Sequence, residues 1–212
     1  MHRIIVAAAV AACAASSADA SIFTFTNQVM RAGVSAGSIG DEAVYTGLGP
    51  WYGSRADSAP GMFQFASIGS SLAADQFSFN GKAVLNAAAP GFGGYDAYVE
   101  YRIDFTVNQA AIATMYFDLG RDVAQGSIMS MAVAGPGGSV WVAYLPDTTI
   151  FSATLAPGQY SIVGLLRNVA PSAGNYMNEA WMTGSISAVP VPAPGVIAAL
   201  GLAGLGRPRR RR

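Results

Sequence analysis

The sequence predicts an all-β protein whose body is a single antiparallel β-sandwich with a jelly-roll-like outline. Residues 95–107 alternate between apolar and polar side chains without a break. Glycine- and proline-rich turns separate short apolar runs along the rest of the chain, and stretches with the helical period are scarce. Short strands joined by such turns are typical of sandwiches and jelly rolls.

The clearest predicted element is a strand over residues 95–107. One face should be buried and consists of Tyr95, Ala97, Val99, Tyr101, Ile103, Phe105 and Val107. The opposite face should meet solvent and consists of Asp96, Tyr98, Glu100, Arg102, Asp104 and Thr106. Because the second face carries charges of both signs, we expect cross-strand salt bridges on an antiparallel sheet that is open to water on one side.

The same alternation predicts shorter strands over residues 22–29, 62–68, 76–79, 111–117, 128–134, 139–144, 149–155, 160–166 and 180–189. Residues 118–122 are expected to form a polar turn, and Gly135-Pro-Gly-Gly138 is a strong hairpin signal. Pro157 and Gly158 fit the central positions of a type II turn. The Gly- and Ser-rich stretch 33–60 predicts a long loop region that covers one end of the sandwich.

The first residues predict a secretory signal peptide over 1–20. A short basic start precedes the apolar run 4–15, and Ala18 and Ala20 form a small-x-small cleavage site. An alternative stays open, because residues 10–13 resemble a lipoprotein cleavage box in which Cys13 would carry the lipid. Either interpretation makes this an exported protein. Cleavage after Ala20 would start the mature chain at Ser21, and the predicted β-sandwich domain covers residues 21–189.

The last residues, 190–212, predict a membrane-inserting tail. It combines an apolar helix near residues 194–206 with a proline motif and an arginine cluster, namely Val189, Pro190, Val191, Pro192, Ala193, Pro194, Gly195, Arg207, Arg209, Arg210, Arg211 and Arg212. Arginine beyond an apolar helix stays on the cytoplasmic side, so the helix should run from outside to inside. Its length, roughly 20 Å, is short against a hydrocarbon core of ~30 Å.

This tail resembles the PEP-CTERM sorting signal of Gram-negative bacteria, in the variant that reads Val-Pro-Ala-Pro-Gly. The resemblance covers 24 of the 212 residues and implies sorting only. It implies recognition and cleavage by an exosortase, a membrane-bound thiol protease or transpeptidase, in bacteria that make exopolysaccharide. The chain departs from the family pattern in two ways, because the motif lacks the central glutamate and the helix is a few residues short.

The composition of residues 21–189 restricts the function further. This body holds six basic and eleven acidic residues, a net charge of −5, which argues against nucleic acid as a partner. His2 and Cys13, the only histidine and cysteine, lie in the predicted signal peptide. The body therefore lacks the residues of Ser-His-Asp and Cys-His catalysis and of ordinary zinc, copper, haem and iron–sulfur ligation. We expect no enzyme activity and no cofactor.

Carboxylates are the remaining polar candidates. Asp96, Glu100 and Asp104 share one strand face, where neighbours two apart lie ~6.6 Å from each other and neighbours four apart about twice that. A glycosidase needs two carboxylates roughly 5–9.5 Å apart across a cleft, so surface salt bridges are favoured here. Asp118 and Asp122 offer a weak calcium candidate without the spacing of a dedicated loop.

Exposed aromatic residues are the other candidates. Trp51 and Tyr52, with Tyr98 and Trp181, carry amphipathic rings that suit stacking on sugars. The sequence favours a non-enzymatic envelope or extracellular-matrix protein associated with exopolysaccharide, transiently anchored in the membrane and then held at the outer surface or secreted. A carbohydrate-binding β-sandwich module is the alternative, and a carboxylate-dependent glycoside hydrolase is the third.

Overall fold

The structure is a computed structural model that describes residues 21–36, 39–59, 61–87, 94–122, 126–170 and 176–192. The predicted signal peptide with Ala18, Ala20 and Cys13, and the tail from Ala193 onward, lie outside the described residues. Within the described ranges, no helix combines the length and apolar character needed to cross a membrane.

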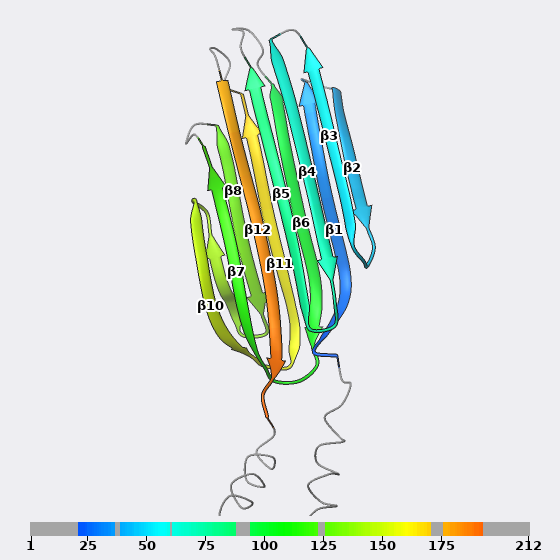
Figure 1. The fold of residues 1–212 in the computed structure, drawn as a ribbon, viewed down its shortest axis with the longest axis vertical. Helices are drawn as coiled ribbons and strands as arrows, with labels where there is room; N and C mark the ends of the chain where they lie inside the picture. The colour runs from blue at the N-terminus through cyan, green and yellow to red at the C-terminus, as the bar shows by residue number, and fades with distance from the viewer. Residues whose placement is uncertain are drawn as a thin grey trace, which may run out of the picture.

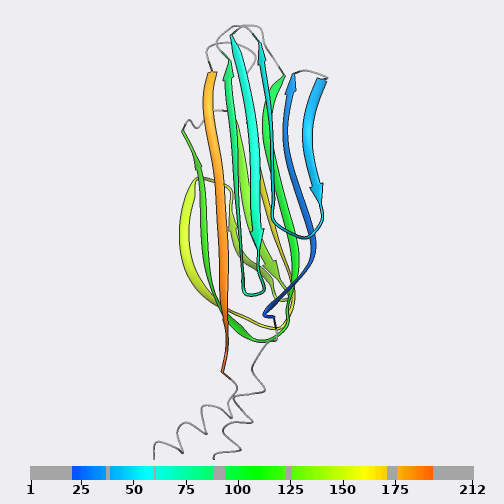
Figure 2. The ribbon, with the colours of Figure 1, turned by 45° about the vertical axis from the view of Figure 1, so that its right-hand side comes forward.

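The described residues form two antiparallel six-stranded sheets that pack face to face (Figures 1 and 2). Sheet A has the order β2-β1-β6-β11-β8-β9, and sheet B has the order β10-β7-β12-β5-β4-β3. The predicted two-sheet sandwich is confirmed. Its strands are β1 Phe23–Ala36, β2 Ile39–Thr46, β3 Trp51–Ala59, β4 Met62–Leu72, β5 Gln76–Ala87, β6 Tyr95–Val107, β7 Ala111–Arg121, β8 Ser127–Gly135, β9 Gly138–Ala143, β10 Asp147–Leu155, β11 Gly158–Val169 and β12 Tyr176–Pro190.

Strand β6 has the predicted bounds, and the predicted hairpin between β8 and β9 is confirmed. Two other predictions are wrong. Residues 33–60 do not form a loop region, because they hold the end of β1 and all of β2 and β3. Residues 118–122 do not form a turn, because β7 continues to Arg121. At the predicted type II turn the chain crosses from sheet B to sheet A, and Gly158 has a φ of 149°, well beyond the ~80° of that turn.

The core lies between the sheets and is rich in aromatic rings. The predicted inner face of β6 is buried from Ala97 to Val107 at alternate positions, whereas Tyr95 is only partly buried. The ring of Tyr101 stacks on Phe79 of the opposite sheet, with centroids 4.1 Å apart. Phe117 of β7 stacks in the same way on Trp141 of β9 at 4.7 Å. These rings fill the space that would otherwise separate the sheets.

Glycines inside the strands are covered by aromatic rings of directly paired neighbours. Tyr98 lies across Gly33, and Trp181 lies across Gly120. A ring laid over a glycine replaces the packing that the missing side chain cannot provide. This explains the wrong predictions at 33–60 and 118–122, because glycine and serine there conceal the alternation that a sequence pattern needs.

Buried amide side chains cross the core and join the two sheets. Asn168 of β11 donates to the carbonyl oxygen of Ala83 in β5 at 2.8 Å, and Gln64 of β4 donates to that of Ser35 in β1 at 2.9 Å. Gln28 of β1 meets Ser70 of β4 at 2.7 Å. In the orientation that satisfies the whole Gln28 amide, its oxygen accepts the bond from the Ser70 hydroxyl. Its nitrogen donates to the carbonyl oxygens of Gly47 and Gly49, at 3.2 and 3.1 Å.

The first prediction concerns a glycine that is held between two buried rings. In Gly184→Ala, the new Cβ would lie 2.4 Å from Phe79 and 3.0 Å from Phe117, whose buried rings have no room to move. We expect this overpacking to lower the free energy of unfolding by about 1–3 kcal/mol in chemical denaturation. Gly137→Ala is the control, since a Cβ at Gly137 has no atom within 4 Å and should leave stability unchanged.

The second prediction concerns the inter-sheet amides. Asn168→Ala removes the side-chain donor to the carbonyl oxygen of Ala83 and the acceptor of the Ser127 hydroxyl, which then keeps its bond from Asn178. We expect a loss of about 1–3 kcal/mol in the free energy of unfolding, because buried polar groups then lack hydrogen bonds. Asn80→Ala, at an exposed position of the outer surface, should cost little by comparison. Equal losses in the two variants would contradict the bridging role.

Candidate functional site

The outer surface of sheet B carries many uncharged polar side chains, interspersed with exposed apolar residues such as Phe63, Ile150 and Met177. Register pairing arranges them in cross-strand rows, because every second residue of each strand points to the same side. We call this surface the polar face, and its hydroxyl and amide groups include those of Ser67, Ser71, Gln76, Ser78, Asn80, Thr114, Thr148, Ser152, Thr183, Ser185 and Ser187.

A groove of about 310 Å³ lies on the polar face where β4, β5 and β12 meet. Its polar side chains are those of Ser71, Gln76, Ser78, Ser185 and Ser187. The partly buried Tyr116 of β7 is the paired neighbour of Ser185 and flanks the groove on the same surface.

Sequence reasoning did not select these groove residues. A signal was present in the alternating Ser, Thr and Asn of residues 76–80 and 183–187, which marks two adjacent polar strand faces. The pattern indicates solvent exposure, but it cannot show that the two segments pair in register.

The two residues predicted to contact sugars point in opposite directions. Tyr52 lies on the polar face, is 65% exposed, and passes over Gly69 with its ring. Gly69 is two residues from Ser71, so the Tyr52 ring stands close to the groove. Trp51 points between the sheets and stacks on Tyr45 of β2, with ring centroids 5.2 Å apart. Of these two residues, Tyr52 is therefore the one whose ring is exposed to solvent.

Charges on the polar face are few, and each is held by a neighbouring side chain. Among the described residues of this face, the charged side chains are Lys82, Glu179 and Asp118. Lys82 and Glu179 form a salt bridge of 2.6 Å. Asp118 accepts hydrogen bonds from Thr148 at 2.6 Å and from the indole of Trp181 at 3.1 Å. The face therefore offers hydrogen-bonding groups with little net charge.

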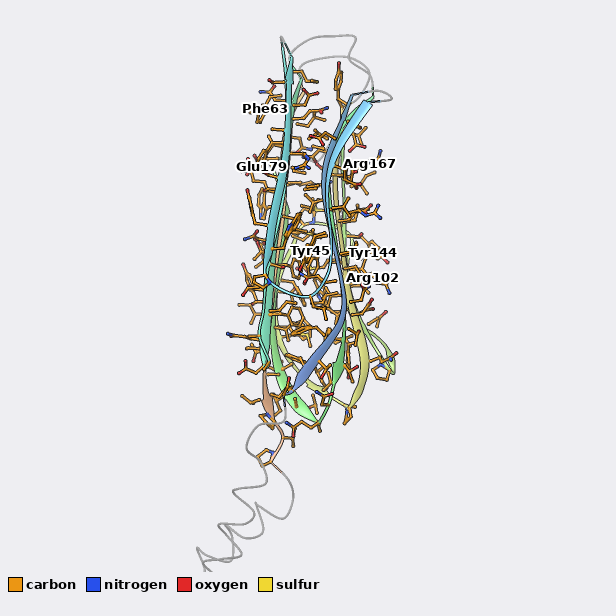
Figure 3. All side chains as sticks on the ribbon, turned by 90° about the vertical axis from the view of Figure 1, so that its right-hand side faces the viewer. Tyr45, Phe63, Arg102, Tyr144, Arg167 and Glu179 are labelled. Carbon is orange, nitrogen blue, oxygen red and sulfur yellow. The ribbon has the colours of Figure 1, made fainter. Side chains whose placement is uncertain are left out.

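The outer surface of sheet A is different, because charged residues follow β6 and its neighbours. Figure 3 shows Arg102, Arg167 and Tyr144 on this side of the molecule, with Phe63 and Glu179 on the opposite side and Tyr45 between the sheets. The predicted surface salt bridges are confirmed: Arg31 lies 3.8 Å from Glu100 and 3.9 Å from Glu42.

The prediction that every residue on the charged side of β6 meets solvent is wrong at Asp96. It is only 6% exposed, and its carboxylate accepts a hydrogen bond from Arg167 Nε at 2.7 Å. This bond and the charge of Asp96 raise the pKa of the Arg167 guanidinium. The long arginine side chain of the adjacent strand covers the carboxylate, which a simple alternation of faces does not anticipate.

The three carboxylates of β6 do not form a hydrolytic pair. Asp104 is bound by Arg102 at 3.0 Å and by the Asn27 amide at 2.9 Å. Glu100 and Asp104 are four residues apart on the strand, which places them ~13 Å from each other, beyond the ~9.5 Å limit of glycosidase pairs. The same spacing separates Asp96 from Glu100. Their arrangement is that of a surface salt-bridge network.

The other aromatic candidates are engaged in the fold. Tyr98 donates its hydroxyl to Glu42 at 2.8 Å while its ring covers Gly33. Partial burial of Tyr98, as the larger cause, and its hydrogen bond to Glu42, as the next, raise the pKa of Tyr98 to about 12. Trp181 is held between Gly120 and the carboxylate of Asp118. These rings stabilise the sheets, and neither is as open as Tyr52.

The calcium candidate gains no support from the geometry. Asp118 is taken up by its two hydrogen-bond donors, and Asp122 lies just after the end of β7. Over the ranges that the structure describes, no cluster of three or more His, Cys, Asp or Glu residues could hold a metal ion.

No protein-family model and no curated protein matches the chain. Among solved structures, the chain has a likeness to TmCBM61 in complex with β-1,4-galactotriose, at 10% sequence identity and a TM-score of 0.23. The alignment covers 66% of this chain and 88% of that one. At this level of overlap the likeness carries no argument about fold or ligand.

Proposed function

We propose that this chain is a non-enzymatic, exported envelope or matrix protein whose β-sandwich binds exopolysaccharide through the polar face of sheet B. The observation that carries the proposal is the groove of about 310 Å³, whose lining joins four serines and a glutamine to Phe77 and Ile186, with Tyr52 over nearby Gly69 on the same face. Such a surface presents donors, acceptors and an aromatic ring together.

The chemistry of the polar face suits a neutral or weakly charged glycan. Serine, threonine and amide side chains both donate and accept hydrogen bonds, as sugar hydroxyls do. The ring of Tyr52 supplies an apolar surface with a polar tip, which fits the mixed character of a pyranose. Lys82 is paired with Glu179, and Asp118 is bound only by neutral donors, so the described charges of this face do not select an anion.

Sorting through the C-terminal tail is the second part of the proposal. The motif begins at Val189, where β12 is ending, and Val191 makes one last backbone hydrogen bond to Ala110 at 2.9 Å. Strand β12 ends at the same end of the sandwich at which β1 begins (Figure 1). A tail leaving there would be accessible to an exosortase and to the membrane, while the polar face stays outside.

The third prediction tests glycan binding. The full chain should bind exopolysaccharide of its producing bacterium, or a neutral oligosaccharide on a glycan array. Tyr52→Ala should weaken that binding at least about tenfold, or ~1.4 kcal/mol, in isothermal titration, because the stacking surface is lost. The matched control is Tyr144→Ala, since Tyr144 is 72% exposed but lies on the side of sheet A. Absence of binding to every glycan would refute the proposal.

The fourth prediction tests sorting. Deletion of residues 193–212 leaves β12 and the Val191 hydrogen bond intact. In a bacterium that carries an exosortase, we expect the truncated chain to lose envelope retention and to collect in the periplasm or the medium. Fractionation and immunoblotting would measure this. If the truncated chain keeps its location, the sorting part of the proposal is refuted, whereas the glycan-binding part is not affected.

A further inference from the structure

The four edge strands of the sandwich differ in how well they are protected. Edge strands expose unpaired backbone groups, and proteins usually guard them with charges, bulges or short length. At one side, β2 and β3 are tied by a salt bridge of 2.8 Å between Asp41 and Arg55. At the other side, β9 is only six residues long, and its pairing with β8 is interrupted by a register shift.

Strand β10 has none of these protections. It pairs with β7 over nine consecutive residues without a register shift, and no described strand lies on its other side. After Asp147 its sequence reads Thr-Thr-Ile-Phe-Ser-Ala-Thr-Leu, with no charge, proline or glycine. Such a segment combines high β-propensity with low charge, which favours pairing with another strand.

Several exposed apolar side chains lie on the outer surface near this edge, separated by the polar pair Ser152 and Thr114. Ile150 of β10 is 71% exposed, and its paired neighbour on β7 is Tyr116. Further down the same surface, Ile112 is 44% exposed and Val189, its neighbour on β12, is 60% exposed. These side chains would add apolar contact beside any strand that pairs with this edge.

We propose that β10 pairs with β10 of a second copy of this chain, antiparallel, to form a dimer with one continuous sheet. A second copy is the fitting partner because the strand is compatible with itself. Its one charge, Asp147, lies at the end of the strand, so antiparallel pairing places the two Asp147 residues at opposite ends. A parallel arrangement would place these like charges side by side, which is unfavourable.

The dimer closes upon itself. When a two-fold axis relates the two antiparallel β10 strands, both β10 edges are used in the pairing. The charged β2 and β3 edges then prevent further copies from adding to the sheets. The same axis is perpendicular to the joined sheet, so both polar faces lie on one side. Dimerisation follows from the edge alone, whether or not the polar face binds a glycan.

The fifth prediction tests the dimer by sedimentation velocity of the full chain. Ile150→Lys/Ser152→Lys places exposed lysines where the two copies would oppose each other, and should raise the dimer dissociation constant at least about tenfold. The control is Val44→Lys/Thr46→Lys, the same charge change at exposed positions of edge strand β2, which should stay dimeric. A monomeric parent protein, equal loss in both variants, or open-ended polymers would each overturn the proposal.

Cysteine crosslinking then tests the direction of pairing. Single cysteines at residues 148, 150, 152 and 154 would be introduced in a Cys13→Ser background, because Cys13 is the only cysteine. Antiparallel pairing predicts disulfide formation that is strongest at the position, or the two neighbouring positions, nearest the two-fold axis and falls off on both sides. Equal crosslinking at all four positions indicates a parallel, in-register arrangement and would refute the inference.

Discussion

The alignment of the two sheets depends on amide side chains that cross an apolar interior. The described body contains no cysteine, so no disulfide fixes one sheet against the other. Apolar burial is non-directional and tolerates sliding, whereas Gln28, Gln64 and Asn168 are fully buried and each needs a partner in the opposite sheet. Any shift that breaks these bonds leaves buried polar groups unpaired, which makes one alignment favourable.

Glycines covered by rings let this low-charge sequence form long strands. Glycine normally weakens a strand, yet Gly33 and Gly120 lie inside β1 and β7 under the rings of Tyr98 and Trp181. A glycine covered by a ring also shapes the candidate site. Gly69, under Tyr52, provides no side chain of its own on the polar face, so the tyrosine ring lies close to the sheet near the serine-lined groove.

Strands with clear local alternation of apolar and polar residues could be predicted from the sequence. Features that arise only when distant segments pair could not. Strand β6 was predicted with its bounds because its buried residues, apart from Ala97, are large enough to show the period. Strands β2 and β3 were missed because their alternation is carried by small and polar residues. The groove joins Ser71, Ser78 and Ser185, which are separate in sequence and meet only through register. Tyr52 was selected because its residue type, unlike serine, suggests sugar contact on its own.

The two proposals reinforce each other through geometry. A single groove of this size holds little of a polymer, and one tyrosine gives modest binding energy. Pairing of β10 strands would place two polar faces side by side on one surface, and a long polysaccharide could then engage both. Two linked weak sites bind a repeating polymer far more strongly than either site alone, without any new contact. If the chain is held in a polysaccharide matrix as proposed, pairing through β10 would therefore increase its avidity.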